Sequence, residues 1–486
     1  MKRIWLEGMK WLGAAGVLAA TLTAAEFRDP VEAALTPAPP SPPGLEQGRG
    51  PLVLRPPDQL KNRPVWERTA RPPQGGIILQ PRTPRSRFRP QPPRVEFQDG
   101  DRVLLLGEAF EFDRPHGYLQ TRMLSQWPDR RVHIRNLGWP GVALLEAQTN
   151  GGWGPDIEKL LTPAASWKPT KVFISLGRQD GVIGGIRTNE FREVFDRFLD
   201  RLTALNDESP AQLVIVSPPA YEVTRYGLID AQAANNRTAP YILATWQVST
   251  NRQIPFVNLF GWSIYDSENQ RKEAAEQQAT LRYYTTDGTH LNGYGMWRLS
   301  FGLGLHLRWP HNTWRFGLMA DNTMRDGGFG MDILSHHRST REAWLQGRAW
   351  RLPTPNPPGV IDLSENHPQC YIQVTGFDPG LYALQVDGVE VVRGTHKDWA
   401  KYRVIAEGPD WGLAEQVRRL VVEKTRAVTR WAGQFADPPA REAAEKEIAS
   451  LEDRIAKLLK PPARVFYWKR IGDAPEESEA DKKPKH

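Results

Sequence analysis

Cysteine is nearly absent from this chain of 486 residues, in which Cys370 is the single example. One cysteine excludes internal disulfides. The fold must therefore rest on a hydrophobic core, and a chain of this length can build one. Cys370 lies in the alternating stretch CYIQVTGF, which favours a buried small side chain over a reactive thiol.

Long apolar runs are also scarce. The longest, Trp11–Ala25, has about 15 residues, fewer than the roughly 20 that cross a bilayer. Basic residues precede it and the small residues Thr23-Ala24-Ala25 end it, as in a secretory signal. We therefore expect residues 1–25 to be a cleaved signal peptide of a secreted or periplasmic protein, with no transmembrane span after cleavage. An uncleaved membrane anchor is the alternative.

Excess charge of one sign is confined to the N-terminal part. Of the net charge of +7, residues 1–25 carry +2 and residues 26–98 carry +5, so the remainder is formally neutral. A neutral body argues against nucleic acid as a partner. Residues 26–98 also hold 17 prolines and little apolar periodicity, which predicts an extended Pro/Arg-rich tether. Its basic groups could contact a cell-envelope polymer, or could simply be solvated.

From Asp99 onwards, short apolar runs alternate with longer amphipathic segments. The runs are apolar on both faces, as strands of a covered parallel sheet are, and the segments between them have helical spacing. This alternation predicts a doubly wound, flavodoxin-like α/β domain over residues 99–311, with about five parallel strands and a ligand site at their carboxyl ends. The expected strands are Val103–Leu106, Val132–Asn136, Val172–Leu176, Leu213–Ser217 and Phe256–Leu259.

The remaining residues predict two extensions and a tail. Short strands around an Asp387-Gly388 turn indicate a small appended β-rich unit at 312–400. Residues 401–472 are expected to be helical, because Ala440–Lys460 carries an apolar stripe typical of a packing face. The charged residues 473–486 are expected to be a disordered tail.

Four strand ends carry residues suited to chemistry. They are LLLGEAFEFD (Leu104–Asp113), RNLGWPGVA (Arg135–Ala143), SLGRQDG (Ser175–Gly181) and, at the start of the last α/β helix, TDGTHLNGYG (Thr286–Gly295). Their order and sheet context resemble the SGNH, or GDSL, hydrolase superfamily over roughly residues 99–310. The resemblance implies an SGNH-like fold and ester hydrolysis through a serine nucleophile.

The first and last blocks define the nucleophile and its base. In the family the first block is Gly-Asp-Ser; here it is Gly107-Glu108-Ala109, so Ala109 takes the place of the serine. The resemblance makes His290 the general base and Asp287 the residue that orients it. Alternatively, Asp287 could only cap the following helix, His290 could be a core histidine, and Glu108 could be a helix N-terminal acid.

The middle blocks define the oxyanion donors. The resemblance makes Gly141 one backbone donor, unless it only shapes a turn. The family's Gly-x-Asn-Asp is here Gly177-Arg178-Gln179-Asp180, so Gln179 replaces the second donor. Its amide is one methylene further out, and a misplacement of about 1 Å can cost on the order of a hundredfold in rate. Asp180 has the same alternative as Glu108, a helix N-terminal acid.

A methyl group at Ala109 cannot attack an ester, and no serine or threonine lies between Gly107 and Thr121. The first hypothesis is therefore an SGNH-fold protein of the envelope or extracellular space that binds or acts on glycans or small esters. In this hypothesis its serine-esterase activity is impaired or lost, which would make it a pseudoenzyme. In a second, Glu108, Asp180, Asp287 and His290 converge, and an imidazole or carboxylate activates water. A third is an envelope scaffolding protein. We expect no cofactor and no metal, because no tight ligand spacing occurs.

Overall fold

The computed structural model describes residues 95–474, with gaps at 140–142, 150–151, 154, 184–186, 225–226, 228, 279, 311–312 and 358–369. The expected signal peptide, nearly all of the tether, Gly141 and most of the tail lie outside the described residues. Within the described part, no helix is both long and apolar enough to cross a membrane.

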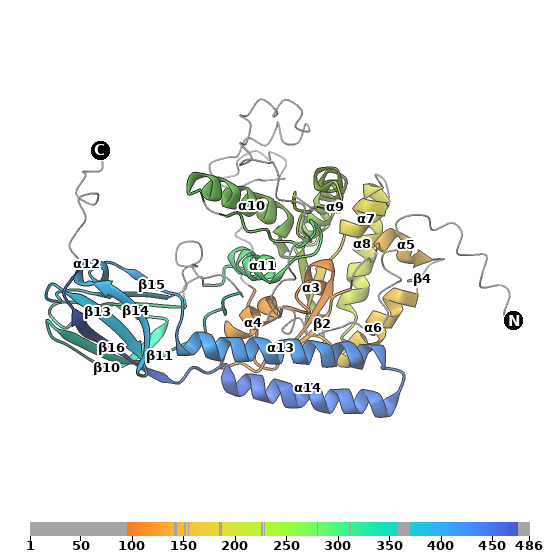
Figure 1. The fold of residues 1–486 in the computed structure, drawn as a ribbon. Helices are drawn as coiled ribbons and strands as arrows, with labels where there is room; N and C mark the ends of the chain where they lie inside the picture. The colour runs from red at the N-terminus through yellow and green to blue at the C-terminus, as the bar shows by residue number, and fades with distance from the viewer. Residues whose placement is uncertain are drawn as a thin grey trace, which may run out of the picture. The chain divides into compact units, whose positions relative to one another are not determined.

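A parallel sheet of five strands organises the first part of the chain (Figure 1). Its order is β2-β1-β5-β6-β7 and every neighbouring pair is parallel, which confirms the predicted flavodoxin-like sheet. Buried aliphatic side chains fill the strands, because helices cover both faces. The strands are β1 (Arg102–Gly107), β2 (His133–Leu137), β5 (Lys171–Ser175), β6 (Gln212–Val216) and β7 (Phe256–Val257).

The helices between these strands carry the expected apolar stripes. In α8 (Thr188–Thr203), for example, the buried side chains recur every three or four residues from Phe191 to Leu202. Short helices stand at the strand ends: α3 (Glu108–Glu111), α5 (Leu144–Ala147) and α7 (Arg178–Ile183). The longer ones are α4 (Tyr118–Ser125), α6 (Pro155–Trp167), α9 (Ala231–Asn251), α10 (Leu259–Glu276) and α11 (Gly293–His306).

The appended β unit consists of a five-stranded sheet, β10-β11-β16-β13-β14, and a four-stranded sheet, β15-β12-β8-β9, around a second core. Cys370 is fully buried in that core, as expected. Asp387 and Gly388 both have positive φ between β13 and β14, which confirms the hairpin turn. The strands are β8 (Trp314–Leu318), β9 (Met324–Phe329), β10 (Met331–Arg338), β11 (Glu342–Ala349), β12 (Cys370–Val374), β13 (Leu381–Val386), β14 (Val389–Thr395), β15 (Arg403–Ile405) and β16 (Ala463–Gly472). Short elements complete the fold: β3 (Gln148–Thr149), β4 (Gly152–Trp153) and α12 (His396–Trp399).

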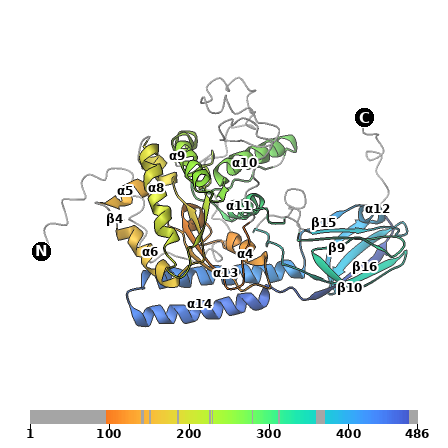
Figure 2. The same ribbon diagram turned by 180° about the vertical axis from the view of Figure 1, so that it is seen from behind.

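The division at residue 400 differs from the expected one. Strands β15 and β16 fall within the stretch 401–472 that we expected to be helical, and β16 lies between β11 and β13 in the larger sheet. The chain leaves the β unit after β15, forms two long helices, and returns as β16. These helices, α13 (Pro409–Gly433) and α14 (Pro438–Leu458), run side by side (Figures 1 and 2).

This helical hairpin, α13 with α14, contributes its apolar stripe to the α/β core rather than to the β unit. Among its buried side chains in that core are Val417, Val421, Ile448 and Leu451. Polar contacts fix the same interface: Gln120 of α4 donates to Thr425 at 3.1 Å. The α/β part is therefore completed by residues that follow it by more than a hundred positions.

Candidate functional site

Asp287 and His290 form a hydrogen-bonded pair just before α11. One Asp287 carboxylate oxygen accepts the backbone N–H groups of Thr289 and His290, each at 2.8 Å, and the other lies 2.7 Å from His290 Nδ1. Burial alone would raise the pKa of Asp287, but these contacts outweigh it and lower that pKa. The cap of α11 is Asn292, which accepts the Gly295 N–H. Asp287 thus orients the imidazole instead of capping the helix.

The His290 side chain is 61% exposed, so it is not a core histidine. Its ring meets the edge of Phe112 with 6.2 Å between ring centroids. Since Asp287 holds Nδ1, a neutral imidazole leaves the Nε2 lone pair as an acceptor. Among the residues that the structure describes, no hydroxyl lies within hydrogen-bond distance of Nε2.

The turn after β1 contains Ala109, which the resemblance places where the family has its nucleophile. Gly107 has φ of +95°, and an added Cβ would overlap the carbonyl oxygen of Ser175, so glycine is required there. Ala109 follows in α3, 2% exposed, and its N–H donates to Ser175 Oγ at 3.3 Å. The Ser175 side chain is itself fully buried at the end of β5. At the position predicted for the nucleophile, the side chain is a methyl group.

Glu108 is a buried acceptor for the start of α7. Its two carboxylate oxygens accept the N–H groups of Arg178 at 3.0 Å and Gln179 at 2.8 Å. Burial outweighs these contacts and the Arg178 charge, and raises the pKa of Glu108 to about 8. The carboxylate therefore acts as a helix N-terminal acid, and the expected convergence of Glu108 on His290 is corrected: both of its oxygens are used by the backbone.

Asp180, in α7, is a buried acceptor of the same kind for the start of α5. Its carboxylate accepts the N–H groups of Leu144 at 3.1 Å and Leu145 at 2.9 Å, at the start of α5. Burial raises the pKa of Asp180 to about 6 despite these hydrogen bonds. It is likewise a helix N-terminal acid and not a partner of His290. Through these hydrogen bonds, α7 contacts the start of α5, which follows Gly141 in the chain. Gln179 is half-buried, and its backbone N–H donates to Glu108.

Two charged residues that the sequence interpretation passed over stand near His290. Arg178 is buried; its guanidinium lies 3.9 Å from the centroid of the Tyr221 ring and donates to the Thr289 carbonyl at 2.9 Å. Glu111, half-buried at the end of α3, has a raised pKa because burial outweighs the charges of His290, Arg114 and Arg178. The signal for Glu111 was its place in EAFE, one helical turn after Glu108.

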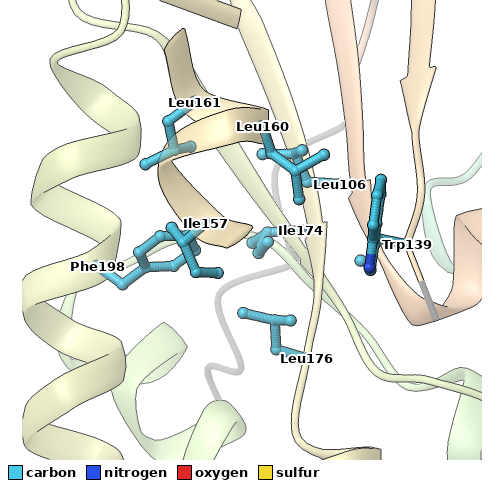
Figure 3. A pocket seen from close by; sticks show the side chains of 9 residues that line it. Leu106, Trp139, Ile157, Leu160, Leu161, Ile174, Leu176 and Phe198 are labelled. Carbon is cyan, nitrogen blue, oxygen red and sulfur yellow. The ribbon is translucent and has the colours of Figure 1, made fainter. Parts of the chain in front are cut away.

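An apolar pocket lies beside the turn at Gly107 (Figure 3). Leucine, isoleucine and phenylalanine side chains from the sheet, α6 and α8 line it, and Trp139, 44% exposed, stands opposite α6 and α8. About 320 Å³ is free of protein atoms, part of it open solvent, and about 20 Å³ can hold the centre of a water-sized group. That space suits one short apolar substituent. The lining residues are Leu106, Gly107, Trp139, Ile157, Leu160, Leu161, Ile174, Leu176 and Phe198.

No family model matches the sequence, and no curated protein matches it. Among solved structures, a gut microbial diltiazem-metabolizing enzyme matches 77% of this chain and 99% of its own, with 14% identity and a TM-score of 0.58. An acetyl xylan esterase matches 41% of this chain and 96% of its own (15% identity, TM-score 0.30). A protein named as a GDSL-like lipase from Parabacteroides merdae matches 45% and 100% (13% identity, TM-score 0.34).

Identities this low speak for the fold alone. The five-stranded parallel sheet and its order are those of a doubly wound, flavodoxin-like fold. The α/β part of the chain has an SGNH-hydrolase-like fold.

Proposed function

We propose that this chain is a secreted or periplasmic SGNH-fold protein that binds glycans or small esters and forms no acyl-enzyme. One observation carries the proposal: the oriented Asp287–His290 pair packs against Phe112, directly after α3, and in that helix the position that the family gives to the nucleophile holds the methyl group of Ala109. A serine esterase needs a hydroxyl that the base can deprotonate. Ala109 offers none.

A base without a protein nucleophile can still engage a hydroxyl that arrives from outside. The His290 side chain is 61% exposed, and its Nε2 can accept a hydrogen bond from a sugar hydroxyl or from water. The apolar pocket beside Gly107 takes one short group, such as the methyl of an acetyl ester. An O-acetylated glycan combines both features. In this proposal the basic N-terminal segment serves as a second contact, to anionic envelope polymers.

The test is hydrolysis and binding by the purified chain. We expect 4-nitrophenyl acetate to be hydrolysed no faster than by a His290→Ala variant. Acetylated xylan oligosaccharides should bind the wild type and should bind His290→Ala more weakly. Robust ester hydrolysis that disappears in His290→Ala would overturn the proposal.

A second candidate is a hydrolase that activates water directly, and Glu111 is the observation in its favour. His290 would take a proton from water, the hydroxide would add to the ester carbonyl, and the alcohol would leave with a proton from Glu111. The raised pKa of Glu111 fits a proton donor. This candidate predicts turnover that resists a fluorophosphonate, a reagent for serine nucleophiles, and falls at least tenfold in Glu111→Gln. Fluorophosphonate-resistant turnover that Glu111→Gln leaves unchanged would rule out this role.

A further inference from the structure

A second cavity lies away from the site, between the connection from α4 to β2 and the helical hairpin. About 360 Å³ there is free of protein atoms, part of it open solvent, and about 20 Å³ can hold the centre of a water-sized group. A space of this size suits a small ion and not a large organic molecule. It is lined by Leu124, Pro128, Arg130, Arg131, Val132, His133, Lys424, Glu452, Ile455, Ala456 and Leu459.

Lys424 is the unusual member of this lining. Its side chain is 1% exposed, and the nearest carboxylate oxygen, from Glu452, is 3.9 Å from Nζ. Within the described residues, Nζ makes no hydrogen bond, although an ammonium has three donors. Burial lowers the pKa of Lys424, and the positive charge of Arg135 lowers it further against the effect of Glu452. A buried ammonium without hydrogen bonds is costly unless something else supplies an acceptor.

Glu452 alone does not supply this acceptor for the Lys424 ammonium. Its other carboxylate oxygen lies 2.6 Å from His133 Nδ1, so this carboxylate is shared between two groups. Arg135, next to the cavity, stacks its guanidinium on Trp431 at 3.9 Å from the ring centroid. Arg131 pairs with Asp453 at the surface and Arg130 with Glu96, yet both also line the cavity. Arg130 and Arg131 thus each have a carboxylate partner, whereas the carboxylate nearest to Lys424 is shared with His133.

We propose that this cavity binds a small oxyanion, a phosphate ion or the carboxylate of a small acid, through Lys424 Nζ and the guanidinium of Arg131. The oxyanion supplies the acceptors that the ammonium lacks. Because Arg131 precedes β2 and Lys424 belongs to α13, the bound ion ties the hairpin to the α/β part. The proposal is independent of the chemistry at His290.

The experiment is thermal unfolding and calorimetric titration of the full chain with inorganic phosphate, sodium chloride keeping ionic strength constant. We expect a saturable rise in melting temperature, because a ligand bound only by the folded state stabilises it. Lys424→Met should weaken phosphate binding at least tenfold. The control Lys446→Met, at an exposed lysine of α14, should bind as the wild type does. Acetate in parallel separates a carboxylate source from phosphate.

Water alone in the cavity would give no saturable response to phosphate or acetate, and would overturn the proposal. A response that Lys424→Met leaves intact would overturn it too. If Lys424→Met fails to fold, Arg131→Gln replaces it, since that side chain is 58% exposed and its removal spares the core. It should bind phosphate severalfold more weakly with an unchanged melting temperature in its absence. Unchanged binding in Arg131→Gln would count against the site.

Discussion

The two ends of the candidate site, the turn after β1 and the segment before α11, differ in whether their side chains suit catalysis. Before α11, both the backbone and the side chains suit acid–base chemistry, with Asp287 holding Nδ1 of His290 at 2.7 Å. After β1, the backbone turn at Gly107 is intact and the side chain of Ala109 is inert.

The difference teaches what the fold itself requires. Gly107 and Glu108 are needed for folding: the first permits close contact with β5, and the second satisfies two N–H groups of α7. A hydroxyl at position 109 would add nothing to that packing. In the proposed function, a nucleophile at position 109 can therefore be absent at no structural cost, whereas Gly107 and Glu108 cannot.

The largest effect is expected from restoring the hydroxyl. Ala109→Ser should raise ester hydrolysis by roughly a hundredfold or more, because the dyad is already oriented and a triad nucleophile is worth several powers of ten. The measurement is 4-nitrophenyl acetate turnover together with labelling by a fluorophosphonate. An unlabelled Ala109→Ser protein would show that the β1 turn and His290 are not aligned for catalysis.

The α11 end is tested in that same variant. Asp287→Asn in the Ala109→Ser background should lose most of the activity that the serine adds. Loss of the orienting aspartate costs a catalytic triad on the order of ten-thousandfold in rate, so the loss should be limited only by the size of the gain. Folding should be unaffected, because Asn292 caps α11. Circular dichroism provides the control. Activity equal to that of Ala109→Ser alone would mean that Asp287 does not orient the base.

Next in size is the stability effect at Gly107. Gly107→Ala should lower the free energy of unfolding by on the order of 3 kcal/mol or more, through positive φ and overlap with Ser175. Gly100→Ala is the matched control, since Gly100 also has positive φ, +80°, with nothing within 4 Å of an added Cβ. It should cost only about 1 kcal/mol. If chemical denaturation gave equal losses of unfolding free energy for Gly107→Ala and Gly100→Ala, the overlap with Ser175 would not be the cause.

A pH dependence of stability is also expected. Glu108 has a pKa of about 8 in the folded chain against 4.5 in its ordinary state, so between these values the folded state keeps a proton that the unfolded state releases. Stability from this group is present below pH 4.5 and declines as pH rises towards 8.

Melting curves at pH 5 and pH 8 measure this decline. The melting temperature should fall with pH by a few degrees more in the wild type than in Glu108→Gln, which cannot ionise. Glu193→Gln, at an exposed glutamate of α8, is the control. Identical pH slopes in the wild type and in Glu108→Gln would show that Glu108 is ionised in the folded chain.

The sequence predicted the sheet because its strands are apolar on both faces, a pattern that parallel packing imposes directly. It also predicted the Asp287–His290 pair, because that contact is local. It did not predict where Glu108 and Asp180 would point, since each reaches backbone groups on another element. Glu111 was missed because it has no counterpart in the Gly-Asp-Ser block.

The β unit shows the same limit. In the stretch ARVFYWKRIG of β16, buried Phe466 and Trp468 alternate with half-buried or exposed neighbours. This strand pattern follows a long helix directly. The stripe on α14 predicted a packing face, but its partner, the α/β core, lies far away in sequence. Local periodicity identifies an element and its buried side. It does not identify what covers that side.

The hairpin between β15 and β16 also governs the order in which the protein can be made. Val417, Ile448 and Leu451 belong to the core of the α/β part, which starts some 300 residues earlier. A ribosome must therefore deliver the chain beyond Leu459 before that core can close. Until then the nascent α/β part exposes apolar surface that the hairpin later covers. A gene truncated after residue 311 would leave it in that unfinished state permanently.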